Sequence, residues 1–119
     1  MQKIYHLSTC NTCKRILDEL NPPSSFILQN IKEDELTEEQ VDEMEQLAGS
    51  YEALFNRKAK LYREKELHLE ELDEGRYKNL ILEHYTFLKR PVIINNDEIF
   101  IGNSKKTVAA AKEAISAKK

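Results

Sequence analysis

The hydrophobic and polar positions of this chain change period several times, and each change marks a boundary between strand and helix. Residues 3–7 form a short β-branched and aromatic run, which predicts a strand. Turn residues follow, and apolar positions at helical spacing then predict a helix over 11–20 that the prolines at 22–23 end. A second strand is expected over 25–30. A strand, helix and strand of these lengths predict parallel strands joined by a right-handed crossover.

The middle of the chain has the pattern of helices. Thr37 and Gln40 have the spacing of a capping box, so we expect a helix to begin there and to end near Gly49. A short helix over 50–55 and another around 76–85 follow from their apolar spacing and starting residues. We interpret this stretch as a helical insertion.

The period returns to that of strands near the C-terminal end. The runs 92–94 and 98–101 are joined by turn residues and predict an antiparallel hairpin. Ser104 is the expected start of a last helix, whose negative dipole end Lys118 and Lys119 would complement. The whole order predicts an α/β fold in which helices flank a four-stranded mixed sheet.

Length and composition limit the organisation and the class of function. A chain of 119 residues is long enough for one modest core, so we expect a single domain over 1–119. The net charge of −3 lacks the basic excess of proteins that bind nucleic acid directly. No apolar run resembles a secretory signal or a membrane span, which favours a cytoplasmic protein without a membrane partner.

The two cysteines of the sequence, Cys10 and Cys13, carry the candidate chemistry. In a reducing cytosol a structural disulfide is unusual, so this spacing indicates redox or metal chemistry. The amino terminus of the predicted helix offers unpaired N–H groups and a positive dipole end, both of which stabilise a thiolate. We therefore expect Cys10 to be the acidic, exposed thiol, and Cys13, one turn deeper, to attack a mixed disulfide at Cys10.

Three nearby side chains are candidates for stabilising the Cys10 thiolate. Lys14 and Arg15 would add positive charge next to the cysteines. His6, at the end of the first strand, would contribute its imidazole, although a histidine at a strand end also fits a simple hydrogen bond to solvent.

Two other interpretations of the cysteines remain. Cys13 would be a small core residue and Cys10 an ordinary loop thiol, because free cysteine packs well in protein interiors. A zinc site would need four ligands, and the three histidines of the chain lack the paired spacing of a second half-site. We therefore expect no metal.

Four short motifs occur in an order that resembles the ArsC/Spx family. They are Ile4-Tyr5-His6 with Cys10, Leu54-Phe55-Asn56-Arg57-Lys58, Leu88-Lys89-Arg90-Pro91-Val92-Ile93 and Phe100-Ile101-Gly102. The resemblance spans nearly the whole chain. It implies a thioredoxin-like fold with a helical insertion, in which a cis-proline at position 91 faces the redox cysteine. The family includes glutaredoxin-coupled arsenate reductases and Spx-type regulators, which bind the C-terminal domain of the RNA polymerase α-subunit.

The resemblance also implies roles for individual residues. Cys10 would attack arsenate, and Arg57 and Arg90 would bind the oxyanion, a task that suits the planar guanidinium. Glutathione or glutaredoxin would be the reductant, with no tightly bound cofactor. Two positions depart from the arsenate reductases. Gly102 stands where those enzymes carry a third arginine, and Cys13 stands where serine is common, whereas the Spx-type proteins have Cys-x-x-Cys and a glycine.

Two functions are consistent with these residues. In the first, the protein is a thiol-dependent oxidoreductase in which Cys10 attacks a small oxyanion or a disulfide, and Cys13 or glutathione resolves the product. In the second, a disulfide between Cys10 and Cys13 switches a surface that docks on RNA polymerase. We favour the first, because residues that activate a thiol and bind an anion are present.

Overall fold

The computed structural model describes residues 1–116, which divide into two compact units. Unit 1 joins Met1–Asp34 to the C-terminal segment that begins at Arg90, and unit 2 is the intervening segment Glu35–Lys89. The chain therefore leaves unit 1 once, builds unit 2 and returns. The expectation of a single domain over 1–119 stays a prediction.

Unit 1 is built on a four-stranded mixed sheet with the order β2-β1-β3-β4. Its strands are β1 (Gln2–His6), β2 (Ile27–Asn30), β3 (Val92–Asn95) and β4 (Glu98–Ile101). The β1 and β2 strands are parallel, whereas the β1/β3 and β3/β4 pairs are antiparallel. The predicted mixed sheet, crossover and hairpin are thus confirmed. The central strands β1 and β3 come from opposite ends of the chain.

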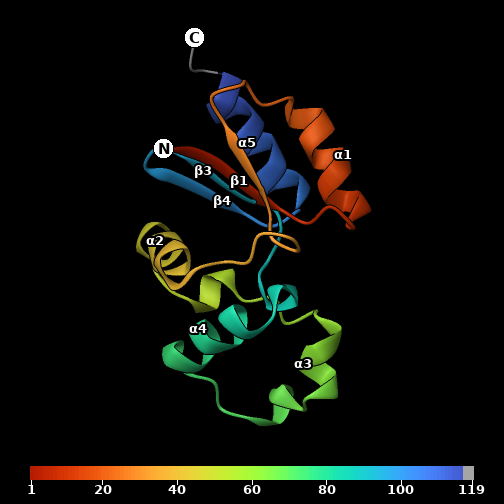
Figure 1. Ribbon diagram of the computed structural model, residues 1–119, viewed down its shortest axis with the longest axis vertical. Helices are drawn as coiled ribbons and strands as arrows, with labels where there is room; N and C mark the ends of the chain where they lie inside the picture. Colours follow the sequence, from red (N-terminus) through yellow and green to blue (C-terminus); the bar gives the residue numbers. More distant parts are fainter. Residues whose placement is uncertain (117–119) are drawn as a thin grey trace. The chain divides into compact units, whose positions relative to one another are not determined.

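Two helices, α1 (Asn11–Leu20) and α5 (Lys105–Ser116), cover one face of this sheet side by side (Figure 1). Their apolar residues and those of the sheet form the core of unit 1, which comprises Ile4, Ile16, Leu20, Phe26, Ile93, Val108, Ala111 and Ile115. Burial of this apolar area is the main favourable contribution to folding of the unit.

The ends of these two helices follow local sequence signals. Asn21, in the left-handed conformation, ends α1, and its N–H donates to the carbonyl oxygen of Leu17. The hydroxyl of Ser104 accepts from the N–H of Thr107 at 3.1 Å, so α5 begins where the sequence predicts. Lys118 and Lys119 lie outside the described residues.

Unit 2 consists of helices and tight turns. Its helices are α2 (Glu38–Ala48), α3 (Lys60–Glu64) and α4 (Glu74–Glu83), and its 3₁₀ turns are η1 (Glu52–Leu54), η2 (Leu67–Leu69) and η3 (Tyr85–Phe87). The capping box of Thr37 and Gln40 is confirmed, and Gly49 ends α2 at φ +96°. Aromatic rings pack together in its interior: Phe55 stacks on Phe87 at 5.4 Å and lies tilted against Tyr77 at 4.9 Å between ring centroids.

Three details of unit 2 differ from the predicted elements. The expected helix over 50–55 is the single turn η1. The helix expected around 76–85 begins earlier, at Glu74, because the Asp73 carboxylate accepts from the N–H of Arg76 at 2.8 Å. The short helix α3 was not predicted, since five residues show no clear periodicity.

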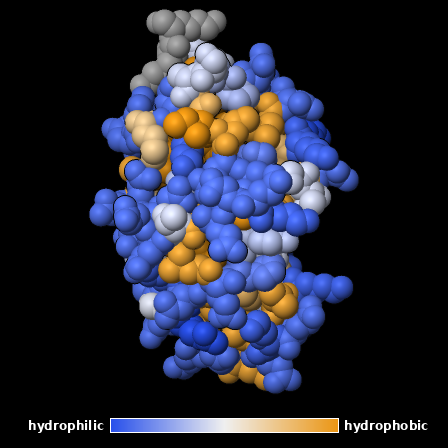
Figure 2. Space-filling model, viewed as in Figure 1, coloured by the Kyte–Doolittle hydropathy of each residue, from blue (hydrophilic) through white to orange (hydrophobic). Residues whose placement is uncertain are grey.

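The face shown in Figure 2 is mainly hydrophilic, and hydrophobic residues occupy small areas of it. Four large apolar side chains are exposed among residues 1–116: Met1, Ile27, Leu28 and Leu69. In the same part of the chain, no helix has both the length and the apolar character needed to cross a membrane.

Candidate functional site

Cys10 occupies the N-cap position of α1, immediately after the loop that follows β1. Its backbone is extended (φ −96°, ψ 111°), and its carbonyl oxygen accepts the first helical hydrogen bond from the N–H of Lys14 at 3.1 Å. The first turn of α1 contains no acidic side chain. The half-buried Cys10 sulfur therefore lies at the positive end of a helix dipole with no opposing charge in that turn.

The pKa of Cys10 is lowered from its ordinary value. Desolvation by burial is the largest single influence and acts in the opposite direction, favouring the thiol. It is outweighed by hydrogen bonds from the N–H and the thiol of Cys13, by a hydrogen bond from the N–H of Thr12, and by the positive charge of Arg90. These donors make the thiolate the favoured form of Cys10 at a lower pH than for a free cysteine.

Cys13 has the opposite acidity. It is fully buried, and desolvation raises its pKa to about 11, with a further increase from its hydrogen bond and charge interaction with Cys10. The backbone of Leu7 and the charge of Arg90 oppose this increase without cancelling it. Cys13 is therefore a thiol at neutral pH and donates its S–H hydrogen bond to the Cys10 sulfur.

Arg90 belongs to the same unit as the two cysteines and acts on both. It is half-buried and precedes Pro91 through a cis peptide bond, as the family resemblance implies. Its charge lowers the pKa values of Cys10 and Cys13. Cys10, Cys13 and Arg90 thus form one electrostatically coupled group, which we call the thiolate site.

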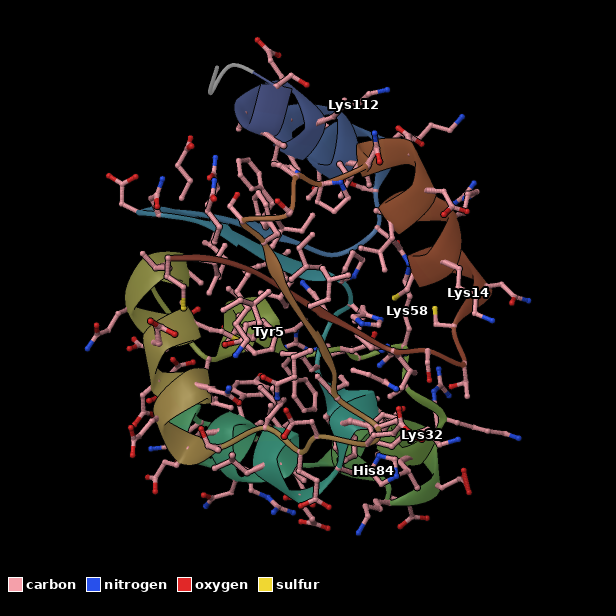
Figure 3. The ribbon with its side chains drawn as sticks, turned by 45° about the horizontal axis from the view of Figure 1, so that its top comes forward. Tyr5, Lys14, Lys32, Lys58, His84 and Lys112 are labelled. Carbon is pink, nitrogen blue, oxygen red and sulfur yellow. The ribbon has the colours of Figure 1, made fainter. Side chains whose placement is uncertain are left out.

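Two of the three residues predicted to stabilise the Cys10 thiolate, His6 and Lys14, have different surroundings. His6 is partly buried at the end of β1, and desolvation lowers its pKa, so its imidazole is neutral at pH 7 and adds no positive charge. Lys14 is exposed on α1 and its side chain extends away from the sheet (Figure 3). Their roles stay predictions, with His6 limited to hydrogen bonding and Lys14 to a solvent-screened charge.

Arg57, the second predicted anion-binding arginine, lies in unit 2 just after η1. Its Nη2 donates to Oε2 of Glu52 at 2.7 Å and to the phenolic oxygen of Tyr77 at 2.6 Å. The hydrogen bond to Glu52 is the main cause that raises the pKa of Arg57. The arginine is thus already engaged with a carboxylate, and its role toward substrate stays a prediction.

Several contributors to these groups have no clear signal in the sequence. Tyr77 is twenty positions from Arg57, and no local pattern links them. The N–H groups of Thr12 and Cys13 follow from the general exposure of donors at a helix amino terminus. No set of three His, Cys, Asp or Glu side chains within residues 1–116 gathers into a group that could hold a metal ion.

The sequence model of the ArsC family matches residues 5–111, a range that includes parts of both units. No curated protein is significantly similar in sequence.

Several solved structures share the fold. The YffB (PA3664) protein aligns with a TM-score of 0.76 and 23% identity over 93% of this chain and 98% of that one. The arsenate reductase from Vibrio cholerae aligns with a TM-score of 0.72 and 23% identity over 92% of this chain and 98% of that one. SACOL0876 from Staphylococcus aureus aligns with a TM-score of 0.70 and 26% identity over 92% and 97% of the two chains. The thioredoxin-like, arsenate reductase-like fold is therefore established.

Proposed function

The chain belongs to the ArsC family, and we propose that it is a cytoplasmic thiol-dependent oxidoreductase whose nucleophile is Cys10. The single observation that carries this proposal is the opposite acidity of its two cysteines. The pKa of Cys10 is lowered and that of Cys13 is raised to about 11, so Cys10 forms its thiolate at a lower pH than Cys13, which is a thiol at neutral pH. A nucleophile needs the thiolate form, and a resolving cysteine must remain protonated until the first step is complete.

With a disulfide substrate, the Cys10 thiolate attacks one sulfur, the substrate S–S bond breaks, and one thiol leaves. Once Cys13 has lost its proton, it attacks the Cys10 sulfur, and the second substrate thiol leaves. The Cys10–Cys13 disulfide that results holds two oxidising equivalents. Two electrons from glutathione or glutaredoxin return both cysteines to thiols. The substrate is thus reduced by two electrons in each cycle.

With arsenate, the Cys10 sulfur replaces one oxygen of the oxyanion, which leaves as water. A second thiol, from Cys13 or glutathione, then attacks the Cys10 sulfur, and the As–S electron pair stays on arsenic, which leaves as arsenite. Arg90 and the helix amino terminus would stabilise the anion during the first step, and the family resemblance implies an anion-binding role for Arg57 as well. The ArsC membership and the arsenate reductase fold support this substrate class.

The test is reduction of arsenate and of a model disulfide by the full chain with glutathione and glutaredoxin. Cys10→Ser is expected to abolish both activities, because a hydroxyl at this position does not ionise at neutral pH. Cys13→Ser is the matched control: it keeps the nucleophile, and glutathione replaces the resolving thiol, so partial activity is expected. Full activity in Cys10→Ser would refute the mechanism, and an inactive wild type would refute the enzyme proposal.

A second candidate function is a redox-switched transcriptional regulator of the Spx type. It is favoured by the contact between the Cys10 and Cys13 thiols and by Gly102, which lies at φ +94° where arsenate reductases carry an arginine. Oxidation would join the two sulfurs and change the surface at the start of α1. Binding of the reduced chain to the C-terminal domain of the RNA polymerase α-subunit, with a different affinity after oxidation, would support this function over the enzymatic one.

A further inference from the structure

The guanidinium of Arg57 already holds an anion of the protein itself. Nη2 of Arg57 bonds the Glu52 carboxylate at 2.7 Å and the Tyr77 hydroxyl at 2.6 Å, and the guanidinium carbon lies 5.4 Å from the centroid of the Tyr77 ring. We call these three residues the Arg57 cluster. All of them belong to unit 2. Within unit 2, Arg57 therefore already binds one carboxylate, that of Glu52.

The two partners of Arg57 are held very differently. Tyr77 is buried on α4, and its ring packs 4.9 Å from that of Phe55 between centroids. Glu52 starts η1, and its side chain is 54% exposed. Packing therefore fixes the Tyr77 hydroxyl, whereas the Glu52 carboxylate is held by an exposed ion pair that contributes little to stability. Tyr77 positions the arginine, and Glu52 occupies it.

The backbone of η1 is fixed even though the Glu52 side chain is exposed. The Glu74 carboxylate accepts from the N–H of Tyr51 at 2.6 Å and from the N–H of Glu52 at 3.1 Å. Glu52 can therefore swing its carboxylate away without unfolding the turn. Movement of this one side chain frees one N–H of Nη2, while the other N–H keeps its bond to the Tyr77 hydroxyl.

The donors of Arg57 favour an incoming anion with several oxygens. Within the described residues, both hydrogen bonds of the guanidinium come from Nη2, which leaves Nε and Nη1 to donate to a further oxygen. A tetrahedral dianion carries twice the charge of the Glu52 carboxylate and has more oxygens to share between these donors. A monoanionic carboxylate has no such advantage over Glu52.

We propose that Glu52 is a specificity-determining residue, an internal carboxylate competitor for Arg57 that dianionic oxyanions displace and monoanions do not. Tyr77 is a positioning residue for the same arginine. This inference rests on the proposed function in placing Arg57 in the anion site, and it adds the charge class of the anion and the residue that selects it.

The experiment is a titration of the full-length chain with sulfate, a dianion at neutral pH, followed by NMR shifts of the Arg57 side chain at low ionic strength. Glu52→Gln is expected to lower the Kd for sulfate about two- to fivefold, the range to which an exposed ion pair corresponds. Tyr77→Phe is expected to raise the Kd, because the arginine loses its fixed partner. Removal of the two hydrogen-bond partners of Nη2 should therefore change the Kd for sulfate in opposite directions.

Controls separate this effect from the general removal of negative charge. Glu83→Gln deletes a carboxylate of similar exposure, 51%, which pairs with Lys65 at 3.2 Å, and it should leave the Kd unchanged. In an Arg57→Gln background, Glu52→Gln should have no further effect. The Glu52→Gln protein should bind acetate more tightly than the wild-type protein does. Wild-type protein should bind acetate only very weakly.

The inference is overturned if Glu52→Gln leaves the sulfate Kd unchanged, raises it as Tyr77→Phe does, or lowers it no more than Glu83→Gln. Wild-type protein that binds acetate as tightly as sulfate would overturn the charge selection. Failure of the proposed function is a separate result: the wild type would reduce neither arsenate nor a disulfide, while the opposite effects of the two Arg57 partners on sulfate binding persisted. If the wild type had reductase activity but Glu52→Gln and Tyr77→Phe did not change the sulfate Kd in opposite directions, only the Glu52 inference would be refuted.

Discussion

At the scale of single residues, one helical turn separates two copies of the same side chain with opposite acidity. Cys10 receives hydrogen bonds at a helix amino terminus, and Cys13 is fully buried and donates one. The difference in pKa between them arises from position, because the intrinsic chemistry of the two thiols is identical. The hydrogen bond between them also couples their acidities, so a change at Cys13 alters Cys10.

The coupling predicts a measurable shift in the pH profile of Cys10 alkylation. The rate with iodoacetamide should rise with pH through an apparent pKa below the ordinary cysteine value, since only the thiolate reacts. Cys13→Ala removes a hydrogen-bond donor from that thiolate, so the apparent pKa of Cys10 should increase. Cys13→Ser restores a donor and should give a smaller increase. An identical profile for all three proteins would show that the Cys13 thiol does not stabilise the Cys10 thiolate.

The sequence predicted the roles of these two cysteines but not all of their surroundings. The position of Cys10 at the start of a helix can be recognised in the sequence, so its lowered pKa could be predicted. The neutral state of His6 depends on burial by residues distant in the sequence, and the contacts of Arg57 with Tyr77 depend on the packing of α4. Local patterns contain no information on either.

At the scale of elements, unit 2 contains two glycines with different backbone conformations, one left-handed and one helical. Gly49 ends α2 at φ +96°, where side chains other than glycine are strained, and a Cβ there would meet no atom within 4 Å. Gly75 lies in the first turn of α4, where a Cβ would be 3.7 Å from Oδ1 of Asp73, an ordinary contact. Backbone conformation, and not space, distinguishes the two positions.

Alanine at these two positions is expected to have opposite effects on stability. Gly49→Ala should lower the free energy of unfolding by about 1 kcal/mol, because it forces a Cβ into the left-handed conformation. Gly75→Ala should raise it by about 0.4–1 kcal/mol, mainly by restricting the unfolded chain. Urea denaturation followed by circular dichroism measures both. If both variants lost stability equally, the conformational explanation would be wrong.

The sequence predicted the helix starts at Thr37 and Ser104, but it missed α3 and placed the start of α4 too late although Asp73 caps it. Thr37 caps α2 and Ser104 caps α5, and both helices were predicted. Ala59 precedes α3 and has no side chain that can cap it, so the start of α3 carries no signal. Tyr62 on α3 packs its ring 5.9 Å from that of Phe55 between centroids, a tertiary contact of the kind that short helices need.

At the scale of the whole molecule, the core of unit 1 depends on residues from both ends of the chain. Ile4 on β1 and Ile93 on β3 are paired neighbours in the sheet, and both are buried in the core cluster. The sequence predicted a parallel pair and a hairpin, but the adjacency of β1 and β3 depends on contacts across about ninety positions. Local periodicity does not encode such a contact.

Truncation of this shared core should be costly. Ile93→Ala removes a side chain that is 1% exposed and should lower the free energy of unfolding by about 2–5 kcal/mol. Leu28→Ala, on the edge strand β2 at 49% exposure, is the control and should cost well under half of that, since little buried area is lost. Chemical denaturation of both variants provides the comparison. A loss in Leu28→Ala as large as in Ile93→Ala would contradict the assignment of the core.

The separation of unit 1 into two chain segments has a consequence for synthesis on the ribosome. The nascent chain emerges from its N-terminal end, so β1, α1 and β2 leave the exit tunnel long before β3, the strand that pairs with β1. All of residues 35–89 must be translated before β1 can pair with β3. Unit 2 can therefore acquire its helices first, while the strands β1 and β2 await the C-terminal segment with apolar surface uncovered. Premature termination anywhere before β3 would leave that surface open to proteases and chaperones.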